Sequence, residues 1–480
     1  MKPFDPQLSG GVIPPRLRQN ILRYNVKVAG DNLGDATQQE TAMKLDDTQT
    51  AGRVNRRTFL KGLTAATGAA LLPSFVPAPV LGRGGAVAPS EKIGLGVIGM
   101  GSRCGVVLGS MLGESDVRCL AVCDVKAERR RSAKATVDNR NGSTDCATYG
   151  DFRELLARPD IDAVLIATGD RWHALASIMA ARAGKDVYSE KPCGMNSAEC
   201  ALIEATMRQC GRVYQGGTQR RSVANFQKAV QLAHSGKLGK LRTMHASVYQ
   251  PTINFNWLPA EPEPTREELD WDMWLGPSPW RPFNHQYVNG RGWQGYDDFT
   301  AGANLMDWGA HTVDLCQWAN QADDTGPVAY ELASDKIVAR YANGVILELN
   351  YERRIPQESQ LNLGTCPVRF VGDEGWVETG DTGEIGVSPA LRGELRQMGR
   401  KHIGLDAGGH ARNFFDCVRT RAATVVNPTV IRHSHNACFA AAIAWQLNRK
   451  VAFDPIKTEF INDAEANRLC SRAWREPWRI

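Results

Sequence analysis

Residues 93–105 read Ile-Gly-Leu-Gly-Val-Ile-Gly-Met-Gly-Ser-Arg-Cys-Gly, an apolar run followed at once by a glycine-rich turn. The run 93–98 predicts a buried β-strand, and a helix is predicted over 102–112. Gly99 and Gly101 keep such a turn tight and let the backbone approach a pyrophosphate, which then faces the helix N-terminus. We therefore expect a Rossmann-type unit that binds a dinucleotide through Gly99, Met100, Gly101, Ser102 and Arg103.

A carboxylate at the end of the second predicted strand supports this site. Asp124 follows the apolar stretch 117–123, where its side chain would accept hydrogen bonds from the ribose hydroxyl groups. Such a carboxylate favours NAD, because it repels the 2′-phosphate of NADP. Cys104 weakens the pattern, since it stands where G-x-G-x-x-G has its third glycine. Four basic side chains close by leave room for NADP: Lys126, Arg129, Arg130 and Arg131.

Strand and helix patterns alternate from Lys92 onward, which predicts a parallel sheet that binds ligands at the carboxyl ends of its strands. Its strands are expected at 93–98, 117–123, 163–167 and from 187, and its helices at 102–112, 126–138, 152–157 and 172–183. Strand patterns divided by glycine turns follow at 241–248, 337–340, 345–351 and 368–371, with helices at 225–234, 410–418 and 437–447. The expected fold class is therefore α/β.

The composition excludes several classes of protein. The 480 residues carry a formal charge of +5, but residues 1–88 hold 11 Lys and Arg against 6 Asp and Glu. The remainder therefore carries 46 charges of each sign, so no basic excess points to nucleic acid. The twelve cysteines form no C-x-x-C pair and no zinc spacing, so we expect no metal site and mostly buried thiols, including Cys119 and Cys123.

An export signal is predicted near the N-terminus. Asn55-Arg56-Arg57-Thr58-Phe59-Leu60-Lys61 precedes the apolar run 63–80, a pattern typical of the twin-arginine pathway. That run is too short and too rich in Gly, Ala and Pro for a stable membrane span. We expect a leader over 1–88, with Met43 as an alternative start, and a protein exported to the periplasm or beyond through the twin-arginine machinery. A nucleotide domain over 90–217 and a second domain over 218–480 would follow.

Three further motifs identify a family resemblance. Residues 166–173 (Ile-Ala-Thr-Gly-Asp-Arg-Trp-His) are similar to an A-T-P-x-x-x-H turn, with Gly169 in place of the proline. Residues 184–192 end in Glu-Lys-Pro, and residues 306–314 carry D-x-x-x-H. The chain thus resembles the glucose–fructose oxidoreductase and inositol dehydrogenase family, Gfo/Idh/MocA. Its closing Arg475-Glu476-Pro477-Trp478 resembles exported bacterial members.

The resemblance implies a role for each motif residue. Lys191 would touch the substrate hydroxyl, His311 would be the acid/base, and Asp307 would fix or share that role. The resemblance further implies a mostly antiparallel C-terminal sheet in an α+β domain, whose open face packs against another subunit in a dimer or tetramer. We expect cofactor contacts at Thr168, Trp172, His173, Glu190 and Lys191. Substrate contacts are expected at Lys191, Asp307 and His311, at Asp314 one turn beyond His311, and at Trp293 of the tryptophan-rich stretch.

The spacing of Asp307 and His311 agrees with this chemistry. Residues four apart share one helix face, so the carboxylate can orient the imidazole, or both groups can meet one substrate. Hydride transfer from a secondary alcohol needs a group that accepts the hydroxyl proton. The structural alternative is that His311 satisfies local polar groups and that Asp307 caps the helix.

Two other features leave alternatives open. Five of the twelve tryptophans lie between Trp257 and Trp293. They could stack on sugars, with Asn284, His285 and Arg291 bonding hydroxyl groups, or they could clamp a long loop. The pair His433 and His435 has no third metal ligand in view, so we expect a polar surface there.

The function expected is an NAD(P)-dependent oxidoreductase acting on a secondary hydroxyl of a sugar, polyol or inositol. An exported enzyme lacks the cytosolic NAD pool, so it would retain and recycle its cofactor. One alternative is an NAD-dependent glycosidase that works by transient oxidation, elimination and reduction. Another is a sugar-binding protein without catalysis.

Replacing Arg56 and Arg57 by Lys is expected to trap the precursor in the cytoplasm. The paired guanidinium groups, rather than charge alone, carry this address. Fractionation of a bacterial host with the twin-arginine pathway measures the exported fraction, and Arg53→Lys, just upstream, is the matched control. Undiminished export of the double variant would show that another signal is used.

Overall fold

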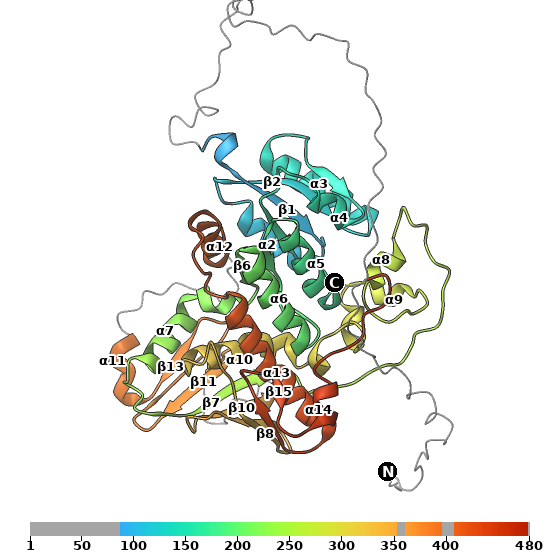
Figure 1. Cartoon of the computed structure of the whole chain (residues 1–480). Helices are drawn as coiled ribbons and strands as arrows, with labels where there is room; N and C mark the ends of the chain where they lie inside the picture. The colour runs from blue at the N-terminus through green and yellow to red at the C-terminus, as the bar shows by residue number, and fades with distance from the viewer. Residues whose placement is uncertain (1–86, 353–360, 396–407, 479–480) are drawn as a thin grey trace, which may run out of the picture. The chain divides into compact units, whose positions relative to one another are not determined.

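The computed structural model describes residues 87–352, 361–395 and 408–478 (Figure 1). The twin-arginine stretch and Met43 lie outside the described residues. No helix in the described ranges has the length and apolar character that crossing a bilayer requires.

A six-stranded parallel sheet forms the first half, in the order β3-β2-β1-β4-β5-β6, and confirms the expected Rossmann-type α/β fold. Every residue of β1, β4 and β5 is buried, as parallel strands are when helices cover both faces. The strands are β1 (Ile93–Ile98), β2 (Val117–Cys123), β3 (Ala147–Tyr149), β4 (Ala163–Ile166), β5 (Asp186–Ser189) and β6 (Tyr214–Gly216). The helices are α2 (Ser102–Met111), α3 (Ala127–Asn141), α4 (Phe152–Leu156), α5 (Asp170–Arg182) and α6 (Ser197–Cys210).

A nine-stranded, mostly antiparallel sheet forms the second half, which confirms the C-terminal sheet that the family resemblance implies. Within the described residues β7 and β10 run parallel, and the other neighbours run antiparallel. The order is β13-β12-β11-β7-β10-β9-β8-β14-β15. The strands are β7 (Leu241–Val248), β8 (Ala329–Leu332), β9 (Lys336–Arg340), β10 (Ile346–Tyr351), β11 (Val368–Gly372), β12 (Trp376–Thr379), β13 (Ile385–Val387), β14 (Val451–Asp454) and β15 (Glu459–Phe460).

Three helices pack on this sheet: α7 (Ala224–His234), α10 (Met306–Ala319) and α13 (Pro428–Leu447). Helix α13 also contacts α6, so the two halves share one apolar core. The remaining helices are α8 (Trp271–Leu275), α9 (His285–Val288), α11 (Arg392–Leu395), α12 (Gly408–Thr420) and α14 (Ala464–Arg468).

Helix α13 begins earlier than the sequence pattern predicts. Asn427 caps it by accepting hydrogen bonds from the backbone of Thr429 and Val430, and Pro428 occupies the first turn, where its missing N–H costs nothing. The expectation of a polar surface at His433 and His435 is therefore wrong, because both side chains are buried within this helix.

The tryptophan-rich connection between β7 and α10 packs mostly on itself. Trp271 and Trp274 stack with ring centroids 4.7 Å apart, in a small aromatic core. Trp257 and Trp280 remain 56% and 57% exposed. Asn284 caps α9 and His285 pairs with Glu261, so these two do not serve the cavity described below. We call residues 265–294 the strap.

All twelve cysteines lie in the described residues as free thiols, and ten of them are buried. Cys119 and Cys123 lie in β2 and are buried, as expected. Burial raises the pKa of the Cys123 and Cys316 thiols well above the ordinary value, because a thiolate is poorly solvated there.

Gly276→Ala is expected to destabilise the protein by about 3 kcal/mol or more. Gly276 has a φ of +55°, and a Cβ there would lie 2.3 Å from the Trp172 ring. Gly109→Ala is the control, because Gly109 lies within α2 and its Cβ would meet no atom within 4 Å. That change is expected to stabilise by roughly 0.5–1 kcal/mol. Unfolding midpoints in urea measure both, and equal midpoints would contradict the argument.

Candidate active site

The glycine turn after β1 is shaped for a phosphate. Gly99 has a φ of +85°, and a Cβ there would lie 2.8 Å from the carbonyl oxygen of Ala167. A Cβ on Gly101 would meet no atom within 4 Å, so open space lies beside it. Helix α2 starts at Ser102 without a side-chain cap, which leaves its N-terminal N–H groups suited to an anion.

Asp124 organises the turn from the end of β2. Its Oδ2 accepts a hydrogen bond from the backbone N–H of Met100 at 2.7 Å, and its Oδ1 accepts one from that of Lys126 at 2.8 Å. Met100 therefore contributes through its backbone, whereas Asp124 itself lines the cavity. Of the basic neighbours, Arg129 also lines the cavity, with its Nη1 3.8 Å from Asp124 Oδ2.

Two of the other basic side chains are engaged elsewhere. Lys126 Nζ donates to the carbonyl oxygen of Val288 in the strap at 2.7 Å. Arg130 donates to the carbonyl oxygens of Asp124 and Glu267 at 2.6 and 3.2 Å. Both side chains are therefore held by backbone carbonyl oxygens.

One cavity of about 600 Å³ runs from the glycine turn to the motif residues of the second half. Nearly all the residues expected at a cofactor or substrate line it: Gly99, Gly101, Ser102, Arg103, Asp124, Thr168, Trp172, His173, Glu190, Lys191, Trp293, Asp307 and His311. Strap residues Met273, Trp274, Val288 and Gly290 form part of its wall.

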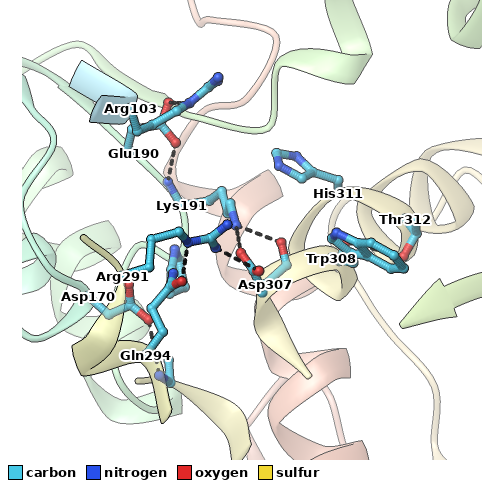
Figure 2. A network of polar contacts seen from close by, with 12 residues as sticks. Arg103, Asp170, Glu190, Lys191, Arg291, Gln294, Asp307, Trp308, His311 and Thr312 are labelled. Atoms are coloured by element: carbon cyan, nitrogen blue, oxygen red, sulfur yellow. Dashed lines mark hydrogen bonds and ion pairs between the residues drawn. The ribbon is translucent and has the colours of Figure 1, made fainter. Parts of the chain in front are cut away.

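Lys191 and Asp307 form an ion pair in this cavity (Figure 2). Lys191 Nζ donates to Asp307 Oδ1 at 2.8 Å and to the Asp307 carbonyl oxygen at 2.6 Å. Arg291 in the strap donates to the other oxygen, Oδ2, at 2.9 Å. Burial alone would raise the pKa of Asp307, but the charges of Lys191 and Arg291 outweigh it and hold the pKa below its ordinary value.

No hydrogen bond joins His311 to Asp307 among the described residues, so of the two expected arrangements the carboxylate does not orient the imidazole here, whereas both side chains line the same cavity. The two share one face of α10, but His311 Nε2 lies 2.8 Å from Arg220 Nη1. A guanidinium group can only donate, so Nε2 accepts and the proton resides on Nδ1, which is buried without a hydrogen-bond partner among the described residues. Burial and then the charge of Arg220 lower the pKa of His311 well below its ordinary value, so the ring is neutral.

Arg220 is itself held rigidly. Its Nε and Nη2 donate to the two carboxylate oxygens of Asp381 at 3.1 and 2.7 Å, which leaves Nη1 for His311. The sequence pattern did not single out this pair, because its members are far apart in the chain. The only signal was the Arg220-Arg221 dipeptide after β6.

Glu190 and His173 support the turns of the cavity wall. Glu190 Oε1 accepts hydrogen bonds from Arg103 Nε at 3.0 Å and Gln219 Nε2 at 2.7 Å. His173 Nδ1 lies 2.6 Å from the Pro192 carbonyl oxygen. Burial lowers the pKa of His173, so its ring is neutral and Nδ1 donates.

Asp314 does not reach the cavity, which corrects the expectation of a substrate contact. It is 1% exposed and pairs with Arg221 through both carboxylate oxygens, at 2.7 and 2.9 Å. Asp170 was not expected but lines the cavity at the start of α5. Burial raises its pKa to about 7. Within the described residues no group of three or more His, Cys, Asp or Glu could hold a metal ion.

Comparison with known proteins gives consistent matches along the described chain. Residues 93–218 match the model of an oxidoreductase family described as an NAD-binding Rossmann fold. Residues 221–480 match the oxidoreductase-family model for the C-terminal alpha/beta domain, under the Gfo/Idh/MocA name.

Individual relatives are more distant. An inositol 2-dehydrogenase of Gluconacetobacter diazotrophicus is 28% identical over 38% of this chain and 54% of its own length. A glycosyl hydrolase family 109 protein of Saccharopolyspora erythraea is 31% identical over 32% of this chain and 34% of its own. Each alignment thus spans about half of the relative or less. The solved structure of a levoglucosan dehydrogenase with NADH and levoglucosan has a TM-score of 0.55 at 16% identity, over 75% of this chain and 99% of that one.

Proposed function

The chain belongs to the Gfo/Idh/MocA oxidoreductase family, and we propose that it oxidises a secondary hydroxyl group of a sugar, polyol or inositol. The observation that carries the proposal is that the Lys191–Asp307 pair and the neutral His311 face the same cavity as the phosphate turn of Gly99 and Gly101. The inositol dehydrogenase relative and the levoglucosan dehydrogenase fold support the substrate class.

Residues 90–217 would bind the dinucleotide, and residues 218–480 would supply the substrate side. The pyrophosphate would lie at the open space beside Gly101, with the adenosine ribose at Asp124. We favour NAD over NADP, because the Asp124 carboxylate lines the cavity and would repel a 2′-phosphate, while Lys126 and Arg130 are held by carbonyl oxygens. When bound, the nicotinamide accepts a hydride from the substrate carbon.

Lys191 is proposed to bind the substrate hydroxyl. Its ammonium group has three N–H donors, and Asp307 engages two. As the C–H bond breaks, the hydroxyl proton would pass to Nζ of a deprotonated Lys191, and the ionised Asp307 would stabilise the ammonium group that forms. His311 has a neutral ring whose Nε2 is occupied by Arg220, so it would not accept the proton directly, which refines the acid/base role that the resemblance implies.

A redox-neutral glycosidase is the second candidate, favoured by the match to a glycosyl hydrolase family 109 protein. It would use the same groups, because both reactions begin with proton removal and hydride transfer. If the twin-arginine leader acts as proposed, the enzyme works away from the cytosolic NAD pool, and one retained cofactor must end each cycle in its starting state. Assembly into a dimer or tetramer through the open sheet face also remains part of the proposal.

Gly101→Val is expected to abolish dinucleotide binding without unfolding the protein. The structure leaves room for the side chain, but that room is where the pyrophosphate would lie. Mass spectrometry of nucleotide released from purified protein and titration with NADH measure the loss. Gly105→Val is the control, because a Cβ on Gly105 would also meet no atom within 4 Å. Wild-type NADH binding by Gly101→Val would contradict the assignment.

Lys191→Met is expected to lower turnover by roughly a hundredfold to ten-thousandfold, the range for groups that handle protons. NADH binding should persist. His311→Asn should lose less, because His311 does not accept the proton directly. Turnover is measured on a panel of inositols, sugars and glycosides, by both product and reduced nicotinamide.

Lys336→Met is the matched control, since Lys336 pairs with Glu348 at 2.8 Å outside the cavity. Wild-type turnover in Lys191→Met would remove Lys191 from the mechanism.

The same assay separates the dehydrogenase from the redox-neutral glycosidase. Many products per enzyme without accumulation of reduced nicotinamide indicate a closed cycle, whereas arrest after one turnover, relieved by added NAD, indicates an ordinary dehydrogenase.

A further inference from the structure

The C-terminal motif 475–478 has no place in the proposed chemistry, yet it holds one wall of the cavity. Arg475 donates from Nη1 to Asp272 Oδ1 at 2.6 Å, from Nη2 to the Asp272 carbonyl oxygen at 2.9 Å, and from Nε to the Gly276 carbonyl oxygen at 3.0 Å. Its own backbone N–H donates to the carbonyl oxygen of Pro277 at 3.0 Å. These contacts fix both ends of α8, whose Met273 and Trp274 line the cavity.

The last described residue of the motif reaches the opposite wall. The Trp478 ring meets the Trp172 ring edge to face, with centroids 4.8 Å apart, and is 6% exposed. Trp172 lines the cavity from α5, and its Nε1 donates to the carbonyl oxygen of Met273 at 3.0 Å. The motif therefore ties the strap to the nucleotide-binding half at the point where both face the cavity.

The strap is attached at the other end of the cavity as well, beside Asp124. The N–H of Ala127 donates to the Glu268 carbonyl oxygen at 3.0 Å, and that of Asp270 donates to the Val125 carbonyl oxygen at 3.3 Å. A dinucleotide lying along the cavity is thus bounded on one side by the ends of the parallel strands and on the other by the strap.

We propose that residues 475–478 form a clasp that keeps the strap closed on the dinucleotide and sets the rate at which the dinucleotide leaves. This inference rests on the proposed function, because it requires a bound dinucleotide. Arg475 and Trp478 are positioning residues: they act through α8 and Trp172. Slow release makes the dinucleotide a resident group, which suits a cycle that returns it to its starting state.

The test measures release of NADH from preloaded protein, by its fluorescence, after excess NAD is added. Arg475→Met removes all three side-chain hydrogen bonds and is expected to accelerate release by at least about tenfold, because losses at a binding interface act mainly on dissociation. Asp272→Asn removes only the charge of one acceptor and is expected to accelerate release by less. Arg475→Lys should restore part of the retention. The double variant should be no faster than Arg475→Met alone, since that change already removes the partner of the Asp272 carboxylate.

Arg449→Met is the matched control. Arg449 also holds an aspartate, Asp463, through two hydrogen bonds, and neither residue lines the cavity. Asp272 is 64% exposed, so Asp272→Asn keeps the fold and the test does not depend on a variant that fails to fold. Wild-type release rates in Arg475→Met and Asp272→Asn overturn the clasp alone. Failure of the wild-type protein to bind any nicotinamide dinucleotide overturns the proposed function and the clasp with it.

Discussion

The ion pair between Lys191 and Asp307 is the constraint around which the cavity is organised. Lys191 follows β5 of the parallel sheet, and Asp307 lies in the first turn of α10, so the pair joins the two halves of the molecule. Their side chains are only 15% and 17% exposed. Removing Asp307 would leave Lys191 desolvated without its carboxylate, and removing Lys191 would leave Asp307 with Arg291 alone, so either loss is costly. The pair therefore keeps α10 against the carboxyl ends of the parallel strands.

Two further ion pairs lie beside Lys191 and Asp307 in the cavity wall. Arg103 meets Glu190, and Arg220 meets Asp381 on one side and His311 on the other. Each guanidinium group presents a planar set of donors, so its direction is set once its carboxylate is in place. The polar groups that face a substrate are thus oriented before it arrives, and little free energy of binding is spent on arranging them.

Much of the fold could be predicted from the sequence, because it follows from local patterns. The strand expected over 241–248 is β7, and the glycine turn follows β1 as the apolar run predicts. The start of α13 could not be predicted from its apolar period, since the cap at Asn427 and the proline after it decide where the helix begins. The spacing of Asp307 and His311 predicted a shared face but not their partners. Those partners, Lys191 and Arg220, depend on how two sheets pack.

The burial of the cysteines determines how the protein reacts with oxidants before and after it folds. Buried cysteines exchange slowly with an external disulfide, because burial disfavours the reactive thiolate and blocks access to it. Ten thiols of the folded chain are thus protected from an oxidising medium, and only Cys210 and Cys470 are partly exposed, whereas an unfolded chain would expose all twelve. A molecule that reaches an oxidising compartment unfolded can therefore form wrong disulfides that hinder its folding. A molecule that arrives folded needs no disulfide-forming catalyst.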